Sequence, residues 1–488
     1  MTVKGYAKYL LVMAGLGGLL YGIDVGVCAA AYPYIENTAS YTKAQLGFIV
    51  GAVLWGSVLS SLFAGFLAEW VGRKKLIIFS AFCFTLSIPV ICASGLFDGG
   101  NFALLSFGRL LQGASAGIVG VVVPMYLAEC LDADSRGKGT GMFQLLLTIG
   151  LVFAAVIGLV VTTLVGAAHA PAEGEVIKPE TLSAWTTAWQ TIFWCSSVPG
   201  LILFFGAFKL KESPRWLYRR GRESEALASL AANNGETKAA EILAEMKAAD
   251  AAEAAQKAAN QASTDTLFQK KYVIPFLLAV AILALNQTTG INSVLNYSVK
   301  IFQETGMYDA FANWSDLAIK VMNMLMTIVA CTLVDRKGRK FLLKLGTSGI
   351  VAGLCGIGLV FLALSSGWVK PSLVTGILAT VSFFLFIASF GVGPGVCVWL
   401  ALSELMPTRI RAAGMSIAMI INQGVSALIA TVFPVWVEQT SYQSVFFTLA
   451  GFTVIYFIIA AFFLPETKGR TLEEIERYFT TGKMPEKK

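Results

Sequence analysis

The stretch EWVGRKK, Glu69–Lys75, decides the fold, because a close copy of it, VDRKGRK, occurs at Val334–Lys340. Each copy directly follows an apolar run, and each places an arginine immediately after a glycine, at Arg73 and Arg339. Glycine permits a tight turn at that point, so the arginine can reach the ends of neighbouring helices. The repetition suggests that the chain contains one architecture twice.

Two further pairs of segments match in the same order. AECLDADSRG at Ala128–Gly137 corresponds to SELMPTRIRA at Ser403–Ala412, and in both segments an acid precedes an arginine by seven residues. KESPRWL at Lys211–Leu217 corresponds to PETKGRTLEEIE at Pro465–Glu476. The duplication therefore extends over most of the chain.

The composition is that of a membrane protein. Of the 488 residues, 56% are hydrophobic and only 14% are charged, whereas a soluble protein carries about 25% charged residues. Most of the apolar runs approach the ~20 residues that a bilayer-spanning helix needs. About twelve such runs are present, at Val12–Ile23, Leu46–Ala68, Leu76–Leu96, Phe102–Val123, Leu145–Val165, Ile192–Phe208, Val273–Leu285, Ile319–Val334, Phe341–Leu364, Leu373–Leu400, Met415–Val437 and Tyr442–Leu464.

One charged, alanine-rich segment, Lys209–Lys271, divides the apolar runs into six and six. Its residues are strong helix formers without a long apolar run, which predicts surface helices. We therefore predict an all-α membrane protein of twelve transmembrane helices in two six-helix halves. The predicted regions are an N-terminal half at 1–208, a helical linker at 209–271, a C-terminal half at 272–464 and a tail at 465–488.

Lysine and arginine gather in alternate loops, and this asymmetry predicts that both termini and the linker are cytoplasmic. The loops predicted for the opposite side hold few cations, namely Lys43, Lys178, Lys300, Lys320 and Lys370. The net charge of +7 is therefore interpreted as a topology signal and not as a nucleic-acid-binding surface.

Two matching halves around a linker are typical of secondary transporters with parallel repeats. The motifs resemble those of the sugar porter family of the major facilitator superfamily over nearly the whole chain. They are GGLLYGID, GRKK, GRLLQG, PMYLAE with SRGKG, ESPRWL, NQTTGIN, DRKGRK, GPGVCVWLALSE and PETKGRTLEEIE. The resemblance implies the major facilitator fold and transport of a monosaccharide, a hexose or pentose, across the plasma (inner) membrane by alternating access. It implies no enzymatic activity.

The resemblance also implies a cytoplasmic gate, in which acids and arginines tie the halves together when the substrate site opens outward and separate when it opens inward. The predicted gate residues are Glu69, Arg73, Glu129, Arg136, Asp335, Arg339, Glu404 and Arg411. The simpler alternative is that these charges only anchor the loops on the cytoplasmic side.

The substrate site is expected near the membrane midplane, where helices are interrupted. Glycine clusters mark candidate interruptions at Gly15–Gly26, at Thr289–Gly290 and at Gly391–Gly395, where Pro394 also removes a backbone donor. Buried amides lie beside these clusters, and an amide offers donors and acceptors to a ligand with several hydroxyls. The predicted substrate-binding residues are Tyr21, Gln144, Asn286, Gln287, Asn292, Asn296, Asn323, Trp399 and Asn422.

By the resemblance, six of these match the family's sugar-contact positions: Gln144, Gln287, Asn292, Asn323, Trp399 and Asn422. Tyr21, Asn286 and Asn296 depart from the residues usual there, so the particular sugar stays open. Trp399 would supply a flat apolar face and an N–H. The alternative for each amide is an interhelical hydrogen bond that only holds the bundle together.

Asp24 stands in an apolar, glycine-rich run, where a charge costs roughly 2.5–3.5 kcal/mol on insertion scales. Arg109 of GRLLQG is a second charge inside a predicted span. A nearby arginine favours the ionised carboxylate and burial favours the protonated form, so the pair could bind and release a proton. By the resemblance, proton-coupled porters carry an acid at this position. The alternative is a static ion pair in a facilitative uniporter.

Proton symport of a sugar is thus the predicted function, with a facilitative uniporter or a transporter-like sugar receptor as alternatives. The cysteines lack metal-ligand spacing and the chain has a single histidine, so we predict no metal site, no catalytic residues and no cofactor. The predicted partners are the monosaccharide, protons and the lipid bilayer. Neither the sugar nor the oligomeric state follows from the residues.

Overall fold

The computed structural model describes residues 3–130, 133–168, 177–261, 269–307, 310–407, 410–467, 474 and 478–479. Within these ranges all regular structure is helical. Twelve helical spans are long and apolar enough to cross a membrane, which confirms the predicted fold class.

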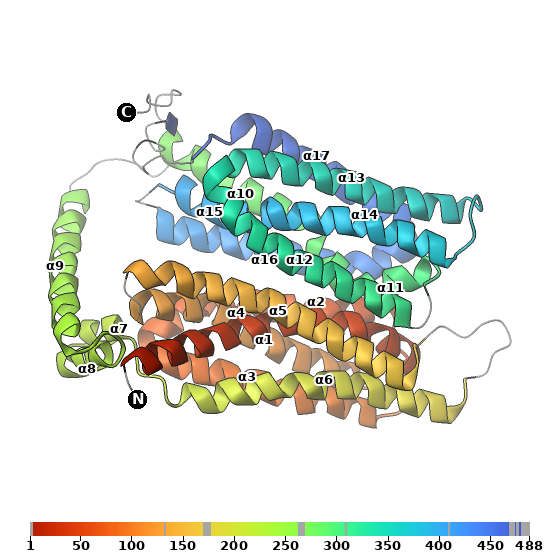
Figure 1. Ribbon diagram of the computed structural model, residues 1–488, viewed down its shortest axis with the longest axis horizontal. Helices are drawn as coiled ribbons and strands as arrows, with labels where there is room; N and C mark the ends of the chain where they lie inside the picture. Colours follow the sequence, from red (N-terminus) through yellow and green to blue (C-terminus); the bar gives the residue numbers. More distant parts are fainter. Residues whose placement is uncertain are drawn as a thin grey trace.

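The two halves lie side by side as two layers of near-parallel helices (Figure 1). The N-terminal half consists of α1 (Val3–Thr38), α2 (Lys43–Val71), α3 (Arg73–Ala93), α4 (Phe102–Cys130), α5 (Ala133–Val165) and α6 (Pro179–Ala207). The C-terminal half consists of α10 (Lys270–Thr288), α11 (Ile291–Glu304), α12 (Ala310–Lys337), α13 (Arg339–Ser365), α14 (Leu373–Val392), α15 (Pro394–Leu405), α16 (Arg411–Gln439) and α17 (Tyr442–Ile458), which continues as a π-helical turn, Ile459–Phe463.

Between the halves, the linker forms α7 (Pro214–Arg219), α8 (Glu223–Asn234) and α9 (Glu236–Gln261) at one end of the bundle (Figure 1). We call this end the linker side and the opposite end, where α1 and α11 finish, the far side. The predicted surface helices are confirmed here, while residues 262–268 and most of the predicted tail lie outside the described residues. Tyr6 near the start of α1 accepts a hydrogen bond from the Lys211 amide, which fixes the linker to the first span.

Two of the spans are each built from two helices, as the glycine signals predict. The seventh span runs through α10 and α11, and Gly290 between them has a φ of 79°, in the left-handed region that glycine adopts without strain. The tenth span changes from α14 to α15 at Gly393, directly before Pro394, which starts the new helix without needing an amide donor.

The prediction of a third interruption, in the first span, is wrong. Helix α1 runs unbroken from Val3 to Thr38. Its glycines instead let it approach α5, since a Cβ at Gly18 would lie 2.2 Å from the Phe143 carbonyl oxygen. Small residues at a membrane-helix contact allow such close backbone packing.

The assignment of Lys300 and Lys320 to loops is also wrong. Lys300 lies in α11 and Lys320 in α12, inside the seventh and eighth spans, and the Lys320 side chain is fully buried. Each has a carboxylate on its own helix, four residues away. Such pairing reduces the cost of a charge in the membrane, so the cation does not mark a loop.

Candidate functional site

A hydrogen-bonded network of polar side chains joins α10, α11 and α16 next to the Gly290 interruption. Gln287 donates from its amide nitrogen to Asn422 Oδ1 at 3.2 Å. Asn292 donates to Gln287 Oε1 at 3.0 Å and to Ser426 Oγ at 2.7 Å. Three amides predicted from the sequence therefore meet at one place, and Ser426 is a member that the sequence did not reveal.

Tyr21, on α1 of the N-terminal half, does not join this network among the described residues. Its hydroxyl accepts a hydrogen bond of 3.4 Å from Gln423 of α16, which follows Asn422 in the sequence. This bond connects α16, which carries Asn422 and Ser426, to the N-terminal half.

The other predicted substrate residues are more scattered. Asn296, one helical turn beyond Asn292, donates to the Asn292 carbonyl at 2.7 Å. Asn286 is buried, and its Oδ1 has no hydrogen-bond partner among the described residues. Gln144 lies half-buried on α5 and Asn323 is buried on α12. Trp399 falls in α15, but its side chain lies outside the described part of the chain.

Asp24 and Arg109 are both buried in the N-terminal half. Arg109 Nη1 donates to Gln112 Oε1 at 2.7 Å, and its Nε donates to the Ile49 carbonyl at 3.4 Å. Arg109 acts electrostatically on Asp24 and the Gln112 side chain lies near its carboxyl group, yet neither Asp24 oxygen has a partner at hydrogen-bonding geometry among the described residues. A direct Asp24–Arg109 ion pair is therefore not formed in this conformation.

Gln112 was missed at the sequence level, although it stands in the GRLLQG motif. Its side chain is buried, and its Nε2 has no described hydrogen-bond partner. One Arg109 nitrogen, Nη2, is in the same situation. Two donors, Arg109 Nη2 and Gln112 Nε2, and both acceptor oxygens of Asp24 are therefore without described partners. These groups can form further hydrogen bonds when the helices move.

The predicted gate residues form one cluster in the N-terminal half. Arg73 directly follows Gly72, which has a φ of 102°, and the guanidinium is buried. Arg73 donates to Glu129 Oε1 at 2.8 Å and also pairs with Glu69. Glu212 accepts from the Arg73 backbone amide at 2.9 Å and so caps α3, while Ser213 donates to Glu129.

The described residues of the C-terminal half repeat the arginine, the paired glutamate, the capping glutamate and the hydroxyl donor of this cluster. Arg339 follows Gly338, with a φ of 90°, and its guanidinium lies 3.0 Å from Glu404 Oε1. Glu466 accepts from the Arg339 backbone amide at 3.1 Å, and Thr467 donates to Glu404. The KESPRWL and PETKGRTLEEIE motifs therefore share one role, because each supplies the glutamate that caps a helix, α3 or α13. The sequence alone did not predict this role.

Among the described side chains, each of these ion pairs joins two residues of the same half. The Arg136, Asp335 and Arg411 side chains lie outside the described part of the chain. The prediction that the gate ties the halves together therefore stays a prediction.

Contacts between the halves, by contrast, involve the far part of the helices. The Glu36 carboxylate on α1 lies 2.9 Å from the Lys300 amine on α11. Asn313 of α12 donates to Thr162 of α5 at 3.2 Å, and Gln303 of α11 donates to the Ala168 carbonyl at 3.2 Å. The described conformation is therefore closed on the far side.

A second buried charge centre, which the sequence reading missed, lies in the C-terminal half. Lys320 Nζ is 2.7 Å from Asp316 Oδ2, one helical turn away on α12. Asp316 Oδ1 accepts a hydrogen bond from Ser298 of α11. Lys320 also donates to the Gly26 carbonyl of α1 at 3.4 Å.

A sequence signal for this centre does exist. Apart from Ser315, the buried polar residues of α12 recur at alternating intervals of three and four, so that they follow one face of the helix. They are Asn313, Asp316, Lys320, Asn323 and Thr327. Only Asn323 was selected at the sequence level.

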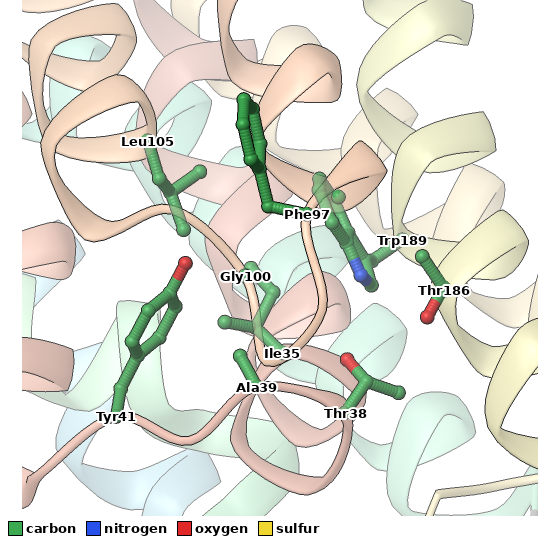
Figure 2. A pocket seen from close by; sticks show the side chains of 10 residues that line it. Ile35, Thr38, Ala39, Tyr41, Phe97, Gly100, Leu105, Thr186 and Trp189 are labelled. Carbon is green, nitrogen blue, oxygen red and sulfur yellow. The ribbon is translucent and has the colours of Figure 1, made fainter.

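A small cavity of about 30 Å³ lies within the far part of the N-terminal half (Figure 2). Its size suits a water molecule and not a sugar. Partial burial raises the pKa of Tyr41, one of its lining residues, to about 12, so this phenol stays neutral at physiological pH. We assign no substrate to this cavity.

Comparisons with known proteins agree with this architecture. A family model described as "Sugar (and other) transporter" matches residues 10–479. The glucose transporter GlcP of Staphylococcus epidermidis is 32% identical over 96% of this chain and 96% of its own length. The galactose-proton symporter of Escherichia coli is 26% identical over 98% of this chain and 96% of its own length. The inward open conformation of the Escherichia coli xylose transporter XylE superposes with a TM-score of 0.79 at 23% identity, covering 97% of this chain and 99% of that chain.

Proposed function

The chain belongs to the sugar (and other) transporter family, and from this premise we propose that it carries a monosaccharide together with protons across the plasma (inner) membrane. The family is one of transporters, so the prediction that the chain is not an enzyme is confirmed. A hexose or a pentose is the proposed substrate, and both termini and the linker are proposed to face the cytoplasm.

The observation that carries the proposal is the polar network of Gln287, Asn292, Asn422 and Ser426 beside the Gly290 interruption of the seventh span. An amide-lined site binds neutral, hydroxyl-rich molecules, because each amide both donates and accepts. The internal hydrogen bonds of the network can be exchanged for bonds to sugar hydroxyls. Such exchange binds the sugar without leaving buried polar atoms bare.

Proton coupling is assigned to Asp24, with Arg109 and Gln112 as its partners. The structure has Arg109 donating to Gln112, and we propose that this arrangement belongs to neutral Asp24. On deprotonation the carboxylate can accept from the unused Arg109 Nη2 and Gln112 Nε2. Proton loss would thereby change contacts between α1 and α4, and so link protonation to the position of α1.

Alternating access follows from movement of one half against the other. We propose that residues 1–208 and 272–464 are these moving halves, that residues 209–271 connect them, and that the tail at 465–488 contributes Glu466 and Thr467 to the second gate cluster. When the far side opens, the two arginine clusters on the linker side would approach and close that side. The relatives named for proton symport, such as the galactose-proton symporter, support the coupled mode of transport.

The test is uptake of labelled hexoses and pentoses into proteoliposomes, with and without an imposed pH gradient. Accumulation that depends on the gradient is expected for at least one sugar. Equilibration without accumulation would instead indicate a uniporter. Sugar binding without flux would indicate a receptor and would contradict the proposal.

A further inference from the structure

Two contacts between the halves on the far side involve charged groups. In both contacts, each charged residue also pairs with a residue of its own half. The outer contact is the ion pair of Glu36 on α1 with Lys300 on α11, at 2.9 Å. The inner contact is the hydrogen bond from Lys320 on α12 to the Gly26 carbonyl on α1, at 3.4 Å. Both connect α1 to the C-terminal half, along the same helix that carries Asp24.

In the outer contact, each charged residue also has a partner within its own half. Glu36 Oε1 lies 2.6 Å from Lys43 of α2, and Lys300 lies 3.0 Å from Glu304 of α11. If the halves separate, Glu36 remains paired with Lys43, and Lys300 remains paired with Glu304. No charge is then left uncompensated at the opening surface.

The inner contact follows the same rule at greater depth. After separation of the halves, Lys320 would remain paired with Asp316, at 2.7 Å on its own helix, and Asp316 would still accept the hydrogen bond from Ser298. Among the described residues, the bond to Gly26 is the hydrogen bond of this group that separation of the halves would break. The buried charges are thus satisfied in both the closed and the separated arrangement.

We propose that these two contacts form a latch that closes the far side, and that the partners within each half make the latch reversible. This inference rests on the proposed alternating-access function. An ion pair whose members had no other partner would strand buried charges on opening, and would hold the transporter in one state. A transporter needs states that differ by only a few kcal/mol, so that ligands can shift their populations.

Lys320 therefore acts as a positioning residue that links the wall of the substrate site to α1. It lies one helical turn from Asn323, on the same face of α12. Through Gly26 it contacts α1 two residues beyond Asp24. Opening of the far side would release α1 from α12 beside the proposed proton site.

The native thiol of Cys28 can report the state of the latch. Cys28 is buried on α1, four residues beyond Asp24 and two beyond Gly26, whose carbonyl accepts the hydrogen bond from Lys320. Its modification by a water-soluble maleimide, measured by peptide mass spectrometry, follows opening of the far side. Cys83, buried on α3, serves as an internal control for general unfolding.

The decisive comparison uses two substitutions with opposite expected signs. Glu36→Gln weakens the contact between the halves and should raise Cys28 modification roughly tenfold. Glu304→Gln removes the partner that Lys300 keeps after opening, and should lower Cys28 modification by about twofold. A general loosening of the protein would raise modification in both variants and at Cys83.

A double variant, Asp316→Leu with Lys320→Met, tests the inner contact without leaving a bare charge. It should also raise Cys28 modification several-fold while Cys83 modification stays unchanged. Wild-type modification of Cys28 in both Glu36→Gln and the double variant would overturn the latch. An increase in Cys28 modification in Glu304→Gln would contradict the proposal that the partners within each half make the latch reversible.

These outcomes are independent of the proposed transport function, because the modification assay contains no sugar. If the wild type moves no sugar but the variants shift Cys28 modification as expected, the latch stands and the proposed function fails. If sugar uptake is normal but modification does not shift, the latch fails and the proposed function stands.

Discussion

Asp24 in the N-terminal half and Asp316 in the C-terminal half are both buried carboxylates inside spans, yet their surroundings differ completely. Asp316 has an ammonium at 2.7 Å and a hydroxyl donor, so both of its oxygens are satisfied. Asp24 has no hydrogen-bond partner for either oxygen among the described residues, although donors of Arg109 and Gln112 are unused. A satisfied carboxylate suits a permanent charge pair, whereas an unsatisfied one can change its protonation and its partners.

The comparison explains how one bundle can hold two buried acids for different purposes. In the C-terminal half the cation and acid lie on one helix, so movement between the halves does not separate them. In the N-terminal half the acid lies on α1 and the cation on α4, so their relation depends on how the helices pack. A change of partners when the helices move is therefore expected at Asp24 and not at Asp316.

The largest effect on stability is expected for Lys320→Met, which leaves the Asp316 carboxylate buried without its counter-ion. Breaking a buried pair on one side costs about 3–5 kcal/mol. The free energy of unfolding should fall by that order, measured as a lower Tm of the purified protein. The Asp316→Leu and Lys320→Met double variant should recover most of the loss, and Asp24→Asn should cost much less. Equal losses in the single and double variants would contradict the comparison.

The second prediction concerns transport by Asp24→Asn. Asparagine keeps the size and hydrogen bonding of the neutral acid but cannot release a proton. In the wild type, a pH difference of one unit can support about a tenfold sugar concentration ratio across the membrane for each coupled proton. The variant should lose this accumulation of sugar entirely. Counterflow of labelled sugar at equal pH should survive, which shows that the variant still binds sugar. Accumulation by Asp24→Asn on an imposed pH gradient would assign the proton to another group.

The smallest effects are expected at the amides, and they separate sugar contacts from interhelical ones. Asn292→Ala and Asn422→Ala should each weaken sugar binding by about 0.5–1.5 kcal/mol, or roughly 2- to 10-fold in Kd. Gln190→Ala, a control that loses an amide hydrogen bond between α6 and α3 within one half, from its side chain to the Cys92 carbonyl, should bind sugar with unchanged Kd. Calorimetric titration of the purified variants measures all three. Unchanged Kd in the first two would mean that these amides only hold the helices together.

Much of the architecture could be predicted because its causes are local. A run of apolar residues spans a bilayer wherever it occurs, and Gly290 and Pro394 interrupt helices through their own backbone chemistry. The same reasoning failed for the glycines of α1, since a glycine can serve either a turn or close packing. Only the position of α5 shows that packing is their role here.

The candidate site was predictable in part for the same reason. Amides near helix interruptions were identified from the sequence, because polar residues are costly in spans and the interruptions are visible. Gln112, Ser426 and the Asp316–Lys320 pair were missed, since their importance depends on neighbours from other helices. Lys320 in particular resembles a loop cation in the sequence, because only the folded helix shows its buried pairing with Asp316.

By itself, the sequence determined the twelve apolar spans, the duplication, the charged linker and the polar residues that the membrane has to accommodate. The tertiary structure alone decided which of these residues meet. It places Gln287, Asn292 and Asn422 together, holds the described ion pairs of the gate residues within one half each, and leaves both Asp24 oxygens without a described hydrogen-bond partner while Asp316 is paired. The physical reason is one of distance. Apolar burial and helix interruption act over a few neighbouring residues, whereas hydrogen bonds and ion pairs at a functional site depend on helices brought together from opposite ends of the chain.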